Sequence, residues 1–81
     1  MHPCVYILSS KPSGVLYIGV TSNLEKRMVE HDQGLIEGFT KRYGTKTLVY
    51  YEMLATMPEA IQREKQLKEW RRAWKVRLIH S

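Results

Sequence analysis

The sequence predicts an α+β fold, in which a small antiparallel sheet packs with helices. Three observations predict it. Two runs of β-branched and aromatic residues near the start are separated by a short stretch of turn formers. Two helix-start patterns follow, and a third β-type run lies between the helices that they begin. The order is strand, strand, helix, strand, helix, and at 81 residues we expect one domain over residues 1–81.

The first two strands are expected to form a hairpin. Residues 5–8 and 15–20 are the β-type runs, and residues 9–14 form the turn between them. Alternation places one set of aliphatic side chains on the face expected to meet the core: Val5, Ile7, Leu16, Ile18 and Val20. The other face carries Tyr6 and Tyr17, which fall opposite each other if the turn takes all six residues.

A helix is expected from about residue 23 to residue 33. Ser22 and Glu25 have the spacing of a capping box, and Gly34 follows as a stop signal. The stripe that should face the sheet comprises Leu24, Arg27, Met28 and His31. Arg27 is unusual there, because arginine is seldom buried without a partner.

The second half of the chain predicts one strand and one or two helices. Residues 34–46 are expected to form a loop with a helical turn, and residues 47–53 the third strand. Thr56 and Glu59 form a second capping box, with Pro58 in the first turn. The helix that follows runs at least to Lys68. After Trp70 it either continues or breaks into a second short helix.

Glu64 stands in the middle of the apolar stripe of that helix, beside Ala60, Ile61 and Leu67. Glutamate is almost never buried unless it is paired or holds a metal. Two interpretations are therefore open, a salt bridge to Arg27 and a metal ligand.

The net charge of +5 and the pI near 9.6 indicate a polyanionic partner, nucleic acid first and an acidic membrane second. Cys4 is the only cysteine, which excludes an intrachain disulfide. No apolar run is long enough to span a membrane, and the start does not resemble a signal peptide. We expect a cytoplasmic protein with no membrane partner.

The positive charge is concentrated near the end of the chain. Residues 59–81 hold seven of the 13 basic residues and three of the eight acidic ones, together with both tryptophans. The segment is either a solvated helix face or a nucleic-acid contact. The evenly spaced Glu59, Glu64 and Glu69 work against binding to an anionic lipid surface.

Several of these motifs occur together in one known family. Val5-Tyr6-Ile7 and Tyr17-Ile18-Gly19 resemble the two strand motifs of the GIY-YIG nuclease superfamily. The helix pattern with Arg27 and His31, and the late Glu64, follow in the same order. The chain is similar to small stand-alone bacterial members and to the N-terminal incision domain of the excision-repair nuclease, excinuclease ABC. The resemblance implies a three-stranded antiparallel sheet flanked by helices.

The resemblance also implies an active site at which five residues converge on one surface: Tyr6, Tyr17, Arg27, His31 and Glu64. It implies a metal-dependent endonuclease that hydrolyses DNA, in repair or recombination. Glu64 would hold one Mg²⁺ or Mn²⁺ ion, and Arg27 would bind the phosphate. Tyr17, with Tyr6 beside it, would orient or deprotonate the water. Because a free phenol ionises near pH ~10, that role needs a neighbouring cation, and His31 is the alternative base.

Further basic residues are candidates for DNA binding: Lys41, Arg42, Lys68, Arg71, Arg72 and Lys75. The choice of target is expected to come from DNA structure or from a partner protein. The alternative function is a catalytically weak or inactive nucleic-acid-binding module of the same fold. Glu64 together with Arg27 favours the nuclease. A protein that only binds nucleic acid has no use for an inward carboxylate, because the carboxylate would repel the phosphates.

Overall fold

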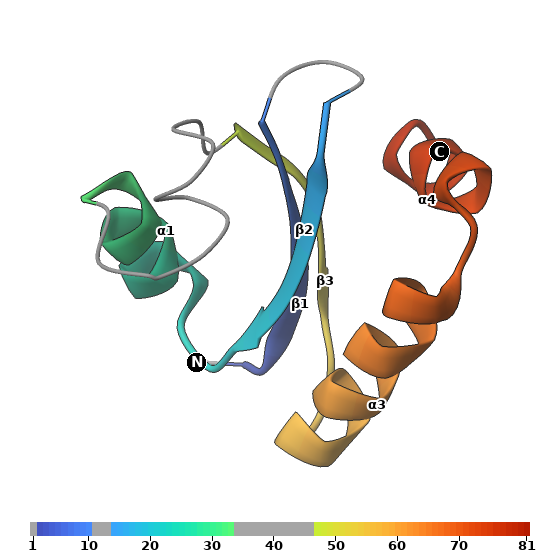
Figure 1. Ribbon diagram of the computed structural model, residues 1–81. Coiled ribbons are helices and arrows are strands. Elements are labelled where there is room, and N and C mark those ends of the chain that lie inside the picture. The colour runs from blue at the N-terminus through green and yellow to red at the C-terminus, as the bar shows by residue number, and fades with distance from the viewer. Residues whose placement is uncertain (1, 11–13, 34–46) are drawn as a thin grey trace.

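The computed structural model describes residues 2–10, 14–33 and 47–81, and in them the chain forms three strands and three helices (Figure 1). The strands are β1 (Cys4–Ser9), β2 (Leu16–Thr21) and β3 (Thr47–Met53). They form an antiparallel sheet in the order β2-β1-β3. The predicted α+β class, with a three-stranded antiparallel sheet and flanking helices, is confirmed.

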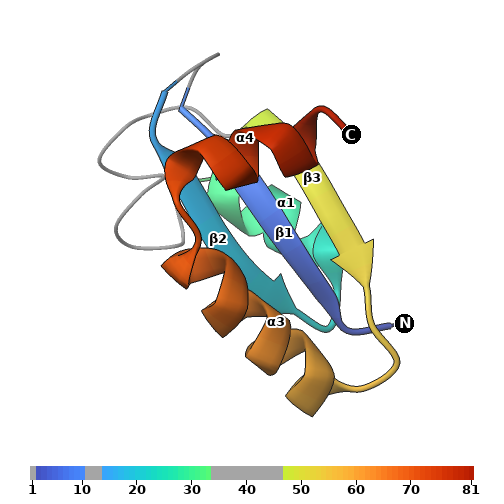
Figure 2. The ribbon, with the colours of Figure 1, turned by 90° about the vertical axis from the view of Figure 1, so that its right-hand side faces the viewer.

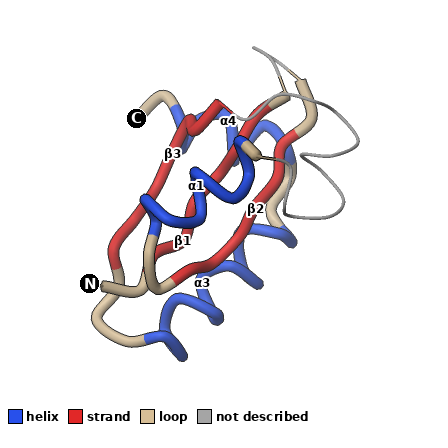
Figure 3. The backbone as a smooth tube through the Cα atoms, turned by 90° about the vertical axis from the view of Figure 1, so that its left-hand side faces the viewer, coloured by secondary structure: helices blue, strands red, loops and turns tan. Residues whose placement is uncertain are grey.

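The helices lie on both faces of the sheet. Helix α1 (Leu24–Asp32) covers one face, and α3 (Met57–Glu69) and α4 (Arg72–Ile79) cover the other, as Figures 1 and 3 show. The helix ends before Trp70, and a second helix follows, so the two are not one continuous helix. Trp70 has extended backbone angles, φ −67° and ψ 146°, and α4 begins two residues later. The break turns α4 across the sheet (Figure 2).

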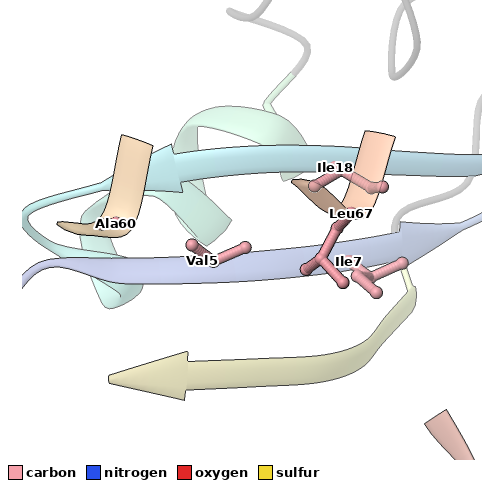
Figure 4. Packing of buried hydrophobic residues seen from close by; sticks show 5 residues of the cluster. All are labelled: Val5, Ile7, Ile18, Ala60 and Leu67. Atoms are coloured by element: carbon pink, nitrogen blue, oxygen red, sulfur yellow. The ribbon is translucent and has the colours of Figure 1, made fainter. Parts of the chain in front are cut away.

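Both faces of β1 are buried. Alternation along the strands had identified only one of them as a core face. Every residue of β1 is buried, because it is the central strand and has a helical layer on each side. The predicted aliphatic face is confirmed: Val5, Ile7 and Ile18 pack against Ala60 and Leu67 of α3 (Figure 4). On the opposite face, Tyr6 and Leu8 form a second, smaller core with Tyr17, Leu24 and Met28.

The expected register of the hairpin is wrong by two residues. Tyr6 pairs with Gly19, and Tyr17 pairs with Leu8, so the two tyrosines are diagonal neighbours. The reason lies at the turn. The Ser10 N–H donates to the Val15 carbonyl, and the Val15 N–H donates to Ser10 Oγ, so the pairing extends into the residues assigned to the turn.

The helix starts agree with the sequence in one case and differ by one residue in the other. Thr56 is the N-cap of α3, and its hydroxyl accepts a hydrogen bond from the Glu59 N–H, as predicted. The N-cap of α1 is Asn23 rather than Ser22, because the Asn23 side chain accepts from the Lys26 N–H. The loop and helical turn expected over 34–46 lie outside the described residues. In the part of the chain that is described, no helix is both long and apolar enough to cross a bilayer.

An ion pair ties the edge strand β3 to α3. Arg63 donates from Nε and Nη2 to the two carboxylate oxygens of Glu52, at 2.8 and 3.0 Å, and the Tyr50 hydroxyl also donates to Glu52. Burial alone would raise the pKa of the Glu52 carboxyl, but these hydrogen bonds and the Arg63 charge hold it below its usual value. The Arg63–Glu52 pair is bidentate, a geometry that arginine can form and lysine cannot.

Candidate active site

Three aromatic rings meet between the sheet and α1. Tyr6 and Tyr17 come from β1 and β2, and His31 comes from the last turn of α1. The His31 ring stands nearly perpendicular to both tyrosines, with centroid distances of 5.8 Å to Tyr6 and 5.4 Å to Tyr17. The two tyrosine rings are 6.2 Å apart. We call these three residues the tyrosine–histidine cluster. The helical spacing that puts His31 on the inward stripe of α1 therefore predicts its position correctly.

The two buried members of this cluster, Tyr6 and His31, are held in their uncharged forms. The Tyr6 hydroxyl and His31 Nε2 share a hydrogen bond of 3.1 Å, and both residues are almost completely buried. Burial raises the pKa of Tyr6, and the neighbouring Tyr17 raises it further. Burial also lowers the pKa of His31, and the positive charge of Arg27 acts in the same direction. Both groups are consequently neutral near pH 7, and neither is positioned to meet a solvent-borne substrate.

Gly19 makes the position of Tyr6 possible. A Cβ atom at residue 19 would lie 2.5 Å from Tyr6 Cζ and closer still to its hydroxyl oxygen, far inside normal carbon contact distances. It would also lie 3.0 Å from Cε1 of Tyr17. The phenol of Tyr6 thus lies over the one residue of β2 that leaves room for it. Sequence reasoning assigned no role to Gly19 beyond its place in the second motif.

Arg27 lies beside the cluster at the edge of a polar hollow. The hollow, of about 450 Å³, is lined by Thr21, Ser22, Asn23, Lys26, Arg27 and Glu30. Arg27 pairs with Glu30 at 3.7 Å, which is too long for a hydrogen bond. Its Nε atom is buried and has no hydrogen-bond partner among the described residues. A guanidinium beside a polar hollow suits an anionic ligand such as a phosphate.

Glu64 lies on α3, in the helical layer on the other face of the sheet. Its helix packs on the aliphatic face of the sheet, whereas Arg27 and His31 belong to α1, which covers the other face. The negative charge of Glu64 is the smallest of the influences that raise the Tyr6 pKa. The predicted salt bridge to Arg27 does not form. Glu64 instead pairs with Lys68, at 3.7 Å.

The donor set near Glu64 sets limits on the metal that could bind. No group of three or more histidine, cysteine or acidic side chains is assembled within the described residues. The Glu64 side chain is 17% exposed, and the Lys68 side chain that pairs with it is 55% exposed. One accessible carboxylate fits Mg²⁺ or Mn²⁺, which commonly take one or two protein carboxylates and complete their shell with water and substrate phosphate.

The predicted DNA-binding residues fall into separate places. Lys68 forms an ion pair with Glu64. The other three, Arg71, Arg72 and Lys75, lie at the start of α4, on the face of the sheet away from α1. Arg72 is partly engaged, because its Nη2 donates to the Gly14 carbonyl at 2.5 Å. Lys41 and Arg42 lie outside the described residues.

Sequence reasoning did not identify the polar residues that surround Arg27. Lys26, Asn23 and Glu30 line the hollow that faces the arginine, and Glu30 is its ion-pair partner. A signal for Glu30 was present, because it stands three residues after Arg27 on one helix. Asn23 and Lys26 are placed by the start of α1, where the chain leaves β2 and the first N–H groups need acceptors.

The fold and this cluster define a class: a three-stranded α+β domain that carries paired tyrosines, a histidine and an arginine between its hairpin and first helix. Residues 2–77 match the GIY-YIG catalytic domain. The chain therefore belongs to the GIY-YIG family, and it carries the domain of that nuclease family.

Individual relatives support this assignment along almost the whole chain. The chain is 42% identical over 77 residues to a UPF0213 protein of Clostridium perfringens, covering 95% of this chain and 82% of that protein. It is 39% identical over 75 residues to one from Staphylococcus saprophyticus, covering 93% and 90%. The solution NMR structure of a UPF0213 protein from Bacillus halodurans is similar, with a TM-score of 0.62 and 30% identity over 99% of this chain and 84% of that one.

Proposed function

We propose that this protein is a divalent-metal-dependent endonuclease that hydrolyses phosphodiester bonds in DNA, in repair or recombination. The observation that carries the proposal is the grouping of Tyr17 and Arg27 around a buried, uncharged Tyr6–His31 pair, with the Glu64 charge among the influences on the Tyr6 pKa. Phosphodiester hydrolysis needs a directed water, neutralisation of charge on the phosphate and a stabilised leaving oxygen. This group of side chains offers a residue for each need.

Tyr17 is the ring that we assign to the attacking water. It is partly exposed, whereas Tyr6 and His31 are almost fully buried and cannot reach a water bound to the substrate. Their role is to position Tyr17. His31 packs its ring edge-on against Tyr17, and the Tyr6–His31 hydrogen bond fixes the orientation of that imidazole. Tyr17 is therefore the base in this proposal, and His31 is not.

Arg27 is assigned to the phosphate. Its guanidinium borders the polar hollow, and its 3.7 Å contact with Glu30 is too long for a hydrogen bond, so a phosphate oxygen in the hollow would gain a charge-assisted hydrogen bond from it. Such donors are most effective where charge develops during the reaction, and losing one typically costs ~10²-fold or more in rate.

Glu64 is the residue that would hold the metal ion. A bound Mg²⁺ or Mn²⁺ would neutralise charge on the phosphate and the leaving oxygen. Binding requires Lys68 to release the carboxylate, and the exposure of that lysine lets it move into solvent. With one carboxylate available, the site suits a single ion that shares its ligands with the substrate.

The decisive experiment compares Glu64→Gln with Glu69→Gln. Both change one glutamate of α3, but Glu69 is exposed and lies at the end of the helix. Duplex, nicked, flapped and single-stranded DNA are incubated with Mg²⁺ or Mn²⁺. We expect Glu64→Gln to abolish nicking, Glu69→Gln to retain it, and both to bind DNA as well as the wild type in EDTA.

Two results would contradict the proposal. Nicking that survives Glu64→Gln would remove the metal role from this residue. A wild-type protein that binds but cleaves none of the four substrates with either metal would leave the alternative, a nucleic-acid-binding module of the same fold.

A further inference from the structure

The helical layer away from the tyrosine–histidine cluster carries an exposed aromatic surface. Trp74 of α4 is 49% exposed, and its ring stands nearly perpendicular to that of Trp70, with centroids 6.1 Å apart. The two indoles border a hollow of about 380 Å³, whose other lining residues are Arg77, Leu78 and Ser81. We call the residues around this hollow the Trp74 surface. The proposed nuclease chemistry uses none of them.

The segment that carries this surface holds charge of one sign. Residues 70–81 contain four arginines and lysines and no acidic residue. Arg71 lies over the Trp74 ring, 5.9 Å from its centroid. Two of the basic residues stand at the start of α4, where the helix dipole is already positive and where no side chain caps the helix. An exposed indole in a segment whose charged side chains are all cations is complementary to a ligand that has flat rings and negative charge.

The Trp74 surface is also rigid on one side. The guanidinium of Arg63 lies over the Trp70 ring, 5.1 Å from its centroid, and is itself fixed by two hydrogen bonds to Glu52. Trp70 is therefore held before any ligand arrives, so less conformational freedom is lost on binding.

We propose that the Trp74 surface binds an unpaired DNA strand, with a base against the indoles and the neighbouring phosphates on Arg71, Lys75 and Arg77. The choice of DNA as the polymer rests on the proposed function. A base inside a duplex keeps both of its faces stacked, so a hollow lined by indoles can take a base only from an unpaired strand. Because α4 and α1 cover opposite faces of the sheet (Figures 1 and 2), this strand is a different part of the substrate from the phosphate at Arg27.

The test measures binding of the full chain to fluorescent oligo(dT) and to a blunt duplex, in EDTA so that cleavage plays no part. Trp74→Leu keeps an apolar side chain without the π-face, Trp74→Phe keeps a ring, and Ile61→Ala removes an exposed apolar side chain from α3 as a control. Since stacking of one base contributes a factor of about 5 to 150 in affinity, we expect that loss for oligo(dT) with Trp74→Leu. Trp74→Phe should retain most of the affinity, and Ile61→Ala should match the wild type.

Intrinsic fluorescence gives a second readout, because the chain has only two tryptophans. Oligo(dT) should quench the wild type more than the duplex does, and Trp74→Leu should lose most of that quenching. Strand binding that depends on Trp74 in a protein without nuclease activity would support this inference while refuting the proposed function.

Five results would overturn the inference. Trp74→Leu could bind oligo(dT) as the wild type does, or Trp74→Phe could lose as much affinity as Trp74→Leu. A concentration-dependent dimer that Trp74→Leu dissolves would assign the surface to a second copy of the chain. Tighter binding to oligo(rU), or to vesicles of anionic lipid, would assign it to RNA or to a membrane.

Discussion

Replacing Gly19 with alanine tests the packing on which the candidate active site depends. The added methyl group would fall 2.5 Å from Tyr6 Cζ and 3.0 Å from Tyr17 Cε1. The Tyr6 ring cannot simply retreat, because it is 1% exposed and has His31 against its edge. We therefore expect the ring to be displaced and its hydrogen bond to His31 to break.

The magnitude follows from these two effects. Overpacking a filled core typically costs about 1–3 kcal/mol, and leaving a buried polar group without its partner costs about 1–3 kcal/mol more. Alanine is the better residue in a strand or helix interior by roughly 0.5–1 kcal/mol, which offsets part of this. The net loss is about 1–5.5 kcal/mol of unfolding free energy, a large share of what a chain of this size has.

Urea denaturation followed by circular dichroism measures that loss, and a double-mutant cycle with Tyr6→Leu identifies its source. Leucine removes the end of the ring that the new methyl group meets. Gly19→Ala should then cost less than about 1 kcal/mol in the Tyr6→Leu background. An equal cost in both backgrounds would refute the argument, because the penalty would not arise from Tyr6.

Three further predictions concern single side chains. Arg27→Ala should lower the cleavage rate about 10²-fold or more in steady-state nicking assays, with little change in the midpoint of unfolding, and an unchanged rate would remove Arg27 from the phosphate. His31 has a folded pKa below the usual value of ~6.5, so the unfolded chain takes up a proton first as the pH falls. Stability should therefore decline below pH ~6.5, by at most ~1.4 kcal/mol per pH unit from this group, and His31→Gln should show a shallower decline in parallel urea titrations. Arg63→Met should cost about 1.5–3 kcal/mol in chemical denaturation, because it leaves the Glu52 carboxylate with Tyr50 alone, and a cost near zero would mean that solvent screens the pair.

Alternation and helical spacing predicted which side chains share a face, but not which helix covers it. The aliphatic set on β1 and β2 was identified correctly, because a period of two leaves no other grouping. The same period does not say that α1 lies over the tyrosines while α3 lies over the aliphatic residues. That depends on how the chain crosses over between strands, which involves contacts between residues far apart in the sequence. The Glu64–Lys68 pair shows a similar limit, since a partner four residues away prevailed over the more distant Arg27.

Local signals failed where two residues of similar propensity compete. Ser22 and Asn23 are both good N-caps, and the hydrogen bond to the Lys26 N–H selects the second. Ser10 is a turn former by type, yet its backbone continues the pairing of the hairpin. No glycine or proline near Trp70 predicts that the helix ends there. It is compatible with the packing that follows, because Trp70 and the end of α4 both contact the core.

The order of the strands explains how residues from both helical layers can serve one proposed site. Tyr6 lies on the central strand and Arg27 on α1, whereas Glu64 lies on α3 behind the sheet. Groups on opposite faces of a sheet can approach one phosphate only past an edge, and β2 is the edge strand against which α3 packs. Gly19 sits on that strand opposite Tyr6. A side chain there would displace the phenol, so the glycine is needed for the packing of Tyr6.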